Sequence, residues 1–239
     1  MLKNNYLLVV CAFFMLSSCK EKTQITFYET NLTSKNNHII EVNIPLAIAN
    51  DKVAKAINST IKSYIITALQ IEESNDSVIK SVEESIENFN NEYNSFISKF
   101  PESTQEWEAQ IDGEVIFKTP YIISVSLTAY TNTGGAHGNL NISFLNFNAS
   151  TGETIENNKL FKNINAFKKI AKAYFKANLE DKDLIFDTEN FQLPKNIGYS
   201  DDGIILLYNT YEIAPYASDI IEFSIPFEVV KPYLIFNRF

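Results

Sequence analysis

The sequence predicts an α+β protein with mainly antiparallel sheets, built as two compact α/β halves. Two long helical stretches come first and a third comes later, while strand and turn patterns gather in blocks between them. Strict strand–helix alternation, the mark of a parallel sheet, is absent from this order. The 239 residues, of which 45% are hydrophobic, suffice for one large core or two small ones. The predicted halves are residues 27–118 and 119–239.

The N-terminal half is expected to hold two long helices. A short strand over residues 39–44 stops at Pro45, and a helix then covers residues 51–70. A second helix covers about residues 77–99, with Asn75 or Asp76 as its N-cap. Apolar residues recur three to four positions apart in both helices, which predicts one buried stripe on each. These are Val53, Ile57, Ile61, Ile65 and Leu69, then Val78, Val82, Ile86, Phe89, Tyr93, Phe96 and Phe100.

The pattern then changes to strands. Residues 106–110 and 114–118 flank Asp112-Gly113, which predicts a hairpin turn. Residues 123–130 alternate between apolar and polar side chains, which predicts a half-buried strand. The alternation resumes at Leu140 and changes parity at Leu145, which predicts a bulge. The remaining expected elements are a helix over 165–179, a hairpin joining 196–199 to 204–211 at Asp201-Asp202-Gly203, a strand over 220–225 and a short helix from Pro226.

The first eighteen residues are predicted to be a lipoprotein signal peptide. Lys3 precedes an apolar run over residues 6–16 that is short for a membrane-spanning helix. The run ends in Leu16-Ser17-Ser18-Cys19, which resembles the bacterial lipobox. Cys19 would then carry acyl chains such as palmitate, residues 19–26 would be a tether, and the protein would be lipid-anchored in the bacterial envelope, periplasmic or on the outer surface. The alternative is an uncleaved N-terminal anchor.

The net charge and the cysteine content limit the kinds of partner and site that this chain is expected to have. The net charge of −9 becomes −10 without residues 1–18, which argues against nucleic acid and against electrostatic adhesion to anionic lipid. It favours a cationic partner or reflects solubility alone. Cys11 lies in the signal peptide and Cys19 carries lipid, so no thiol remains for a disulfide or metal. His38 and His137 are far apart in sequence, and neither a metal site nor a cofactor is expected.

Glycine is scarce and concentrated. The chain has seven glycines and two histidines, and three of these glycines and one histidine lie within Gly134-Gly135-Ala136-His137-Gly138. Glycine is needed where the backbone takes positive φ or another group comes close. A second unusual segment, Tyr211-Glu212-Ile213-Ala214-Pro215-Tyr216-Ala217, follows the Asp202-Gly203 turn.

Together, in this order, the two segments resemble the paired signatures of a bacterial extracytoplasmic domain family of unknown function. The family occurs in the outer part of the lysozyme-sensing anti-sigma factor RsiV, in the N-terminal region of the peptidoglycan deacetylase PdaC, and in stand-alone lipoproteins. The order of elements agrees from about residue 35 to residue 235. The resemblance implies a PdaC-type N-terminal half and a RsiV-type C-terminal half that carries both motifs. The deacetylase keeps its chemistry in a separate metal-dependent domain, and this sequence provides no such domain.

The two segments supply the hypothetical ligand-binding residues, which are Gly134, Gly135, His137, Gly138, Tyr211, Glu212, Pro215 and Tyr216. His137 is either a base or ligand contact, or a ring held by a backbone carbonyl that locks the hairpin. The glycines either cradle an anion or form a tight connection between strands. Because a strand and not a helix follows them, the tight connection is favoured over a phosphate site.

Glu212 and the two tyrosines of the second segment also allow two interpretations. They would contact a sugar or a cation, or they would form a structural corner in which Glu212 accepts backbone amides. Trp107 is expected in the core, with an exposed ligand platform as the alternative. The acidic helix residues Glu83, Glu84, Glu87 and Glu92 are most simply a solvated face, and a cationic lysozyme-like protein would be their alternative partner.

These patterns favour a lipid-anchored binding or sensing module over an enzyme, because no complete set of catalytic groups is present. The expected ligand is cell-wall glycan or a lysozyme-like protein. An envelope hydrolase using His137 with Glu212, and a scaffold lipoprotein without a small ligand, remain the alternatives.

Overall fold

The computed structural model describes residues 25–35, 37–48, 51–71, 81–178, 190–215 and 219–238. A five-stranded sheet has the order β1-β2-β3-β4-β5, and a three-stranded sheet has the order β6-β7-β8. Neighbouring strands are antiparallel except for the parallel pair β2 and β3. The strands are β1 (Thr26–Thr33), β2 (Ile40–Ile48), β3 (Glu108–Lys118), β4 (Ile122–Asn132), β5 (Asn139–Asn148), β6 (Asn196–Tyr199), β7 (Gly203–Tyr208) and β8 (Ile221–Pro226). The predicted α+β class is confirmed.

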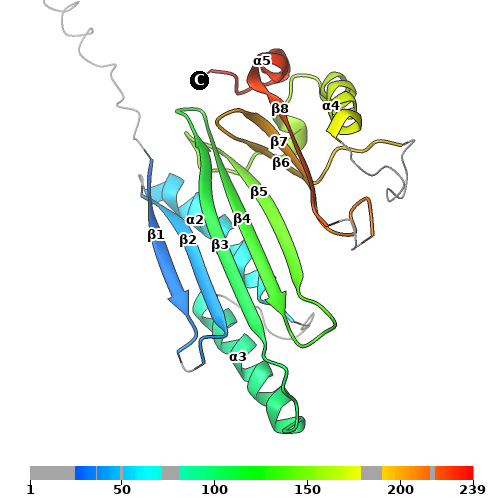
Figure 1. The fold of residues 1–239 in the computed structure, drawn as a ribbon. Helices are drawn as coiled ribbons and strands as arrows, with labels where there is room; N and C mark the ends of the chain where they lie inside the picture. Colours follow the sequence, from blue (N-terminus) through cyan, green and yellow to red (C-terminus); the bar gives the residue numbers. More distant parts are fainter. Residues whose placement is uncertain are drawn as a thin grey trace, which may run out of the picture.

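Helices α2 (Asp51–Ala68) and α3 (Val82–Lys99) cover one face of the five-stranded sheet (Figure 1). They form the crossover between β2 and β3, which is why these two strands run parallel. The second sheet lies at one end of the first, with α4 (Ile164–Asn178), α5 (Phe227–Val230) and the 3-10 turns η1 (Asn157–Lys159) and η4 (Lys231–Tyr233). Along the described part of the chain, none of the helices combines the length and apolar character needed to cross a membrane.

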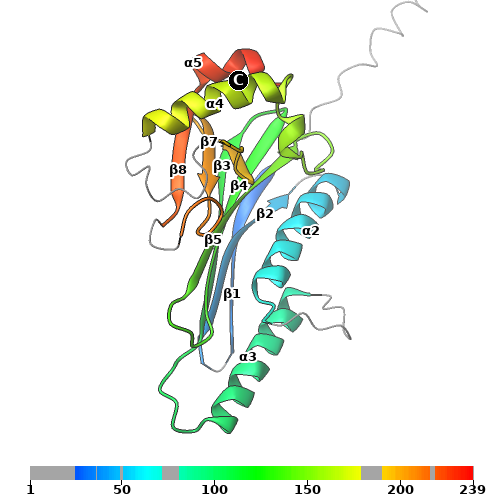
Figure 2. The same ribbon diagram turned by 90° about the vertical axis from the view of Figure 1, so that its right-hand side faces the viewer.

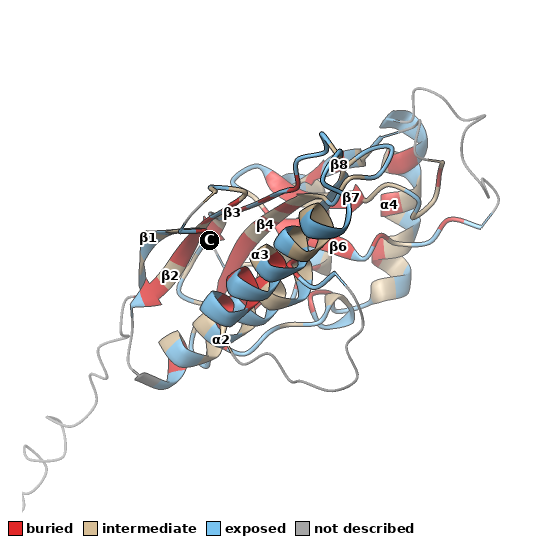
Figure 3. Ribbon diagram, turned by 90° about the horizontal axis from the view of Figure 1, so that it is seen from below, coloured by how far each residue is buried: buried red, intermediate tan, exposed pale blue. Residues whose placement is uncertain are grey.

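The first core lies between the two long helices and the sheet. Ile57, Ile61 and Ile65 of α2 are fully buried, as the four-residue spacing predicts. They pack with the inward residues of β2, β3 and β4. Trp107 belongs to this core and contacts the rings of Phe89 and Phe96, so its predicted core position is confirmed. Seen from below, the strands of the sheet show buried residues, whereas the outward faces of α2 and α3 are exposed (Figure 3).

The second core lies between the three-stranded sheet and α4. Phe167, Ala171 and Phe175 form the buried stripe of α4, and Tyr199 and Tyr208 are fully buried opposite them. The helix predicted over residues 165–179 is confirmed, apart from Leu179, which lies outside the described residues. The predicted hairpin at Asp201-Asp202-Gly203 is also confirmed, since it joins β6 to β7.

The hairpin predicted at Asp112-Gly113 is wrong. Strand β3 runs straight through both residues and pairs with β4 along its length. A Cβ on Gly113 would lie 2.7 Å from Pro45 Cδ and 2.8 Å from Leu127 Cδ2. The glycine is therefore needed because the neighbouring strands crowd it, and not because the chain turns.

Three smaller expectations also differ. Strand β2 continues past Pro45 to Ile48, because parallel pairing with β3 ends at Asn43 and the missing N–H of proline costs no ladder bond there. The register of β5 against β4 is continuous, so no bulge lies at Leu145. Its change of parity instead arises because Phe144 lies against Gly198 of β6, whereas Leu145 and Phe147 pack in the first core. Ser81 caps α3, and the predicted caps Asn75 and Asp76 lie outside the described residues.

The division into halves at residues 118 and 119 stays a prediction. That boundary falls between β3 and β4, which are neighbours in the same sheet. The lipobox, Cys19 and most of the tether lie outside the described residues.

Candidate functional site

The glycine segment is the connection between β4 and β5. Gly134 has a φ of 88°, and its N–H donates to the side chain of Asn132 over 3.0 Å. A Cβ on this residue would also lie 2.7 Å from the Gln105 side chain and 3.4 Å from the Trp107 ring nitrogen. Glycine is therefore required at position 134 both by the positive φ and by the close approach of the Gln105 and Trp107 side chains.

The other two glycines of the segment differ from Gly134 and from each other. A Cβ on Gly138 would lie 2.3–2.5 Å from Cε2, Cζ and the hydroxyl oxygen of Tyr130, so the tyrosine side chain lies directly on this glycine. Gly135 has no neighbour closer than 3.7 Å to such a Cβ. The segment is thus a tight strand connection, as favoured from the sequence.

His137 is exposed at this connection. Its Nδ1 lies 3.0 Å from the backbone carbonyl oxygen of Gly138. A carbonyl accepts only, so this geometry places the proton on Nδ1. The contact matches the structural interpretation of His137, in which a backbone carbonyl orients the ring.

The environment of Glu212 differs from the one expected for a hydrolase that uses His137 with Glu212. Its Oε1 accepts the backbone N–H of Lys195 at 2.8 Å, and its Oε2 accepts that of Asn209 at 3.2 Å. The carboxylate thereby ties the start of β6 to the end of β7. This is the structural corner considered for the second segment, and it explains why an acid stands at this position.

The rest of the second segment is a surface loop. Tyr211 has a φ of 66° and is 59% exposed, whereas Ala214 is buried and Pro215 half-buried. A positive φ on a tyrosine is uncommon and is held here by the bonds of its neighbour Glu212. Tyr216 lies outside the described residues.

Asn209 joins this loop to the five-stranded sheet. The backbone N–H of Ile142 donates to Asn209 Oδ1, and Asn209 Nδ2 donates to the Ile142 carbonyl, both over 2.8 Å. Ile142 lies in β5, the edge strand of the sheet, so the side chain completes a backbone edge that would otherwise be unpaired.

Three further polar residues continue this junction and were not singled out from the sequence. Asn146 Nδ2 donates to the Ile197 carbonyl over 2.7 Å, and Ser124 Oγ donates to Asn146 Oδ1. The N–H of Tyr199 donates to Ser124 Oγ over 3.2 Å, and the N–H of Phe144 to Asn196 Oδ1 over 3.4 Å. The one available signal was asparagine placed inside the apolar run Phe144-Leu145-Asn146-Phe147.

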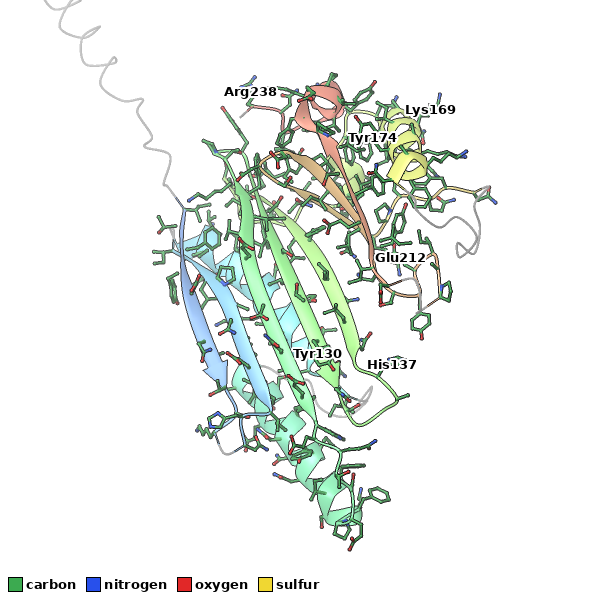
Figure 4. All side chains as sticks on the ribbon, in the orientation of Figure 1. Tyr130, His137, Lys169, Tyr174, Glu212 and Arg238 are labelled. Atoms are coloured by element: carbon green, nitrogen blue, oxygen red, sulfur yellow. The ribbon has the colours of Figure 1, made fainter. Side chains whose placement is uncertain are left out.

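Both motifs consequently lie along β5, although on different parts of it. The loop is attached at Ile142, and His137 lies beyond the start of the strand, at the hairpin end (Figure 4). Glu212 lies nearer the second sheet, with its carboxylate directed to the backbone of Lys195 and Asn209. The structure brings the motifs onto one edge without making His137 and Glu212 a hydrogen-bonded pair.

Strands β4 and β5 carry no charged side chain. Residues 119–152, which include all of β4 and β5, contain no Asp, Glu, Lys or Arg. Leu140 is 38% exposed on this strand, close to His137 in sequence. Within the described ranges, no group of three or more His, Cys, Asp or Glu side chains is placed to hold a metal ion.

Burial affects the tyrosines beneath this edge. It raises the pKa of Tyr199 and Tyr208 well above the ordinary value for tyrosine, and the negative charge of Glu212 adds to the rise of the Tyr208 pKa. Burial also raises the pKa of Tyr64, on α2. These phenols belong to the packed interior and supply no acid or base at neutral pH.

Two family models match different parts of the chain. Residues 32–140 match the model described as deacetylase PdaC, and residues 154–228 match the model described as a protein of unknown function, DUF3298. The chain combines a PdaC-like region with a DUF3298-like region. The family resemblance drawn from the two motifs is confirmed to this extent. The glycine segment lies at the end of the PdaC-like region, and the Tyr211–Pro215 loop lies within the DUF3298 region.

Two solved structures have a similar fold. A DUF3298 family protein from Bacteroides fragilis is similar with a TM-score of 0.62 and 18% identity, covering 90% of this chain and 94% of that one. A second, from Pseudomonas aeruginosa, has a TM-score of 0.55 and 18% identity at the same coverage. At this identity the likeness shows the fold alone. No curated protein sequence matches the chain.

Proposed function

We propose that this DUF3298-containing chain is a lipid-anchored module of the bacterial envelope that binds a ligand without turning it over. The anchor would be Cys19, at the lipobox-like sequence. The binding surface would be the outer edge of β5, from His137 and Leu140 to Tyr211.

The observation that carries the proposal is the state of the polar groups at this edge. Both carboxylate oxygens of Glu212 accept backbone amides, and the Nδ1 of His137 is directed to a backbone carbonyl. A hydrolase using this pair would have to break the bonds that hold the corner together. A binding surface needs only the exposed rings of His137 and Tyr211.

The neutral character of the edge favours cell-wall glycan as the ligand. Strand β5 offers amide and hydroxyl groups beside exposed apolar and aromatic side chains, and residues 119–152 carry no formal charge. Sugars are bound by such hydrogen-bonding groups together with rings that pack on the pyranose face.

A lysozyme-like cationic protein is the second candidate, and a different surface favours it. On the face of the sheet opposite α2 and α3, β2 and β3 present Glu41, Asp112 and Glu114. Asp112 accepts hydrogen bonds from Asn43 and Gln110, which fixes its carboxylate in the sheet face. A cationic partner would meet this face and leave the β5 edge untouched.

Binding of the full chain to cell-wall glycan fragments and to lysozyme, at two salt concentrations, tests both candidates. The glycan proposal expects saturable binding with little salt dependence, weakened about tenfold in a His137→Ala/Tyr211→Ala variant, from about 0.5–1.5 kcal/mol for each lost ring contact. Tyr28→Ala is the matched control, because Tyr28 is a 48% exposed tyrosine on β1, the opposite edge strand.

Each of the other outcomes would favour a different interpretation. Salt-sensitive lysozyme binding that is lost in Asp112→Asn/Glu114→Gln would move the site to the acidic sheet face. Turnover of any fragment that depends on His137 would replace the binding module by the hydrolase. Absence of saturable binding to both ligands would contradict the proposed function.

A further inference from the structure

The charges of this chain are unevenly distributed over the fold. Helix α4 carries Lys168, Lys169, Lys172 and Lys176 and contains no acidic residue. By contrast, the strands of the five-stranded sheet contain Glu29, Glu41, Glu108, Asp112 and Glu114 and a single basic residue, Lys118. The net negative charge of the whole chain therefore conceals a basic surface at one place in the fold.

The lysines of α4 lie on its outer side. The helix buries Phe167, Ala171 and Phe175 against the second core, which leaves Lys169 and Lys176 exposed on the opposite face. Figure 4 shows Lys169 directed away from the molecule. Lys168 is held differently, since its Nζ donates to the Gln192 side chain over 2.8 Å.

The start of β1 lies at the same end of the molecule as α4 and α5. Two views at right angles agree on this, and the glycine segment lies toward the other end (Figure 2). Only residues 20–24 separate Cys19 from Ile25, the first described residue. An extended chain spans about 3.3–3.6 Å per residue, so Cys19 lies within about 20 Å of Ile25.

We infer that α4 docks on the anionic headgroups of the membrane that holds the lipid anchor, and so orients the domain with the β5 edge and glycine segment directed away from the bilayer. This inference rests on the anchor in the proposed function. A tether of this length keeps the α4 end nearest the membrane, and each lysine near an anionic surface contributes about 1 kcal/mol, or roughly fivefold in binding.

Within the described residues, the acidic side chains at this end lie on elements other than α4, and Glu222 lies on β8. Asp201 and Asp202 form the turn between β6 and β7, and Glu228 lies on α5. The backbone N–H of Phe227 donates to the Asp202 carbonyl, which keeps that turn against α5. The docking surface is the outer face of α4, which contains no acidic residue.

The test uses the full chain with a fluorophore on a single new cysteine. Cys19 is acylated in the anchored protein and Cys11 lies in its signal peptide, so Asn165→Cys places one reactive thiol on the exposed face of α4. Ser98→Cys, exposed near the end of α3, is the control position. The protein is anchored in vesicles of neutral phosphatidylcholine, or of phosphatidylcholine with phosphatidylglycerol, that contain a headgroup-borne quencher.

The proposal expects quenching at residue 165 in anionic vesicles, little at residue 98, and loss of the effect at high salt. Lys169→Glu/Lys176→Glu should lower the equilibrium constant for docking by about 25-fold or more, from roughly fivefold for each lysine removed. Lys62→Glu/Lys99→Glu changes the net charge equally on α2 and α3 and should leave quenching at residue 165 unchanged.

The experiment distinguishes failure of the proposed orientation from failure of the lipid anchor. Retention on neutral vesicles with no quenching at residue 165 on anionic ones would overturn the orientation and leave the anchor in place. Absence of retention on neutral vesicles, with no acyl chain on Cys19 by mass spectrometry, would overturn the anchor and the orientation with it.

Discussion

The side chain of Asn209 pairs with both backbone groups of Ile142, accepting from its N–H and donating to its carbonyl at 2.8 Å each. A primary amide has the same donor and acceptor as a peptide group, so the side chain substitutes for a further strand at the edge of β5. Asn58 of α2 pairs in the same way with Ala47 of β2. Both residues fasten a separate element onto the edge of a strand.

Asn209→Ala should lower the free energy of unfolding by about 2–3 kcal/mol, because two hydrogen bonds are lost and two backbone groups lose their partner. Chemical denaturation measures the change. Asn91→Ala, at an exposed position on α3, is the matched control and should change stability by less than about 0.5 kcal/mol. Equal effects of the two substitutions would contradict a structural role for the amide.

His137 and Glu212 should respond differently to truncation. Glu212→Ala removes the acceptor of two backbone amides and should cost about 1.5–3 kcal/mol. His137→Ala removes an exposed ring and should cost less than about 0.5 kcal/mol. Thermal unfolding of both variants checks this, and a catalytic pair would instead predict two stable proteins with equal losses of turnover.

The three glycines of the β4–β5 connection should tolerate alanine unequally. Gly135→Ala should be nearly neutral, since the new Cβ has no neighbour within 3.7 Å. Gly134→Ala should destabilise by about 1–2 kcal/mol because of its positive φ. Gly138→Ala should displace the ring of Tyr130, which a change in the near-ultraviolet circular dichroism would report. A large loss for Gly135→Ala would contradict this assignment.

Stability should fall in alkaline solution. Burial raises the folded-state pKa of Tyr199 and Tyr208 above the unfolded value of about 10. The folded state therefore retains protons that the unfolded state releases, so this contribution is complete below pH 10 and is lost as the pH rises further. Each tyrosine adds up to about 1.4 kcal/mol per pH unit to the slope.

Tyr199→Phe and Tyr208→Phe separate the two contributions. The Tyr199 hydroxyl is buried without a hydrogen-bond partner, so Tyr199→Phe should leave neutral-pH stability unchanged or raised and make the alkaline slope shallower. The Tyr208 hydroxyl donates to the Gln192 carbonyl over 2.5 Å, so Tyr208→Phe should cost about 1–2 kcal/mol at pH 7. Denaturant titrations at pH 7 and above pH 10 distinguish these results.

The sequence by itself determined those elements whose apolar pattern fits only one type of secondary structure with one buried face. The stripes of α2 and α4 and the alternation of β4 each bury one face, and period alone identifies such a face. The order of the two motifs was likewise enough to indicate the family.

The tertiary structure alone decided what the ambiguous residues do. Asp112-Gly113 has the composition of a turn, but the glycine is there because Pro45 and Leu127 lie against it from two neighbouring strands. The parity change at Leu145 needs no bulge, because Phe144 lies against Gly198 of the second sheet and Leu145 packs in the first core.

The tertiary structure also decided the roles of the residues in the candidate site. Tyr211 and Glu212 are the residues that chemistry would select, yet the carboxylate holds the loop together and the asparagines at 146 and 209 join the two sheets. Local sequence reports on periodicity and on the backbone a residue favours. It does not report which distant amide or carbonyl a polar side chain meets, because that partner is brought close only by packing of the two cores.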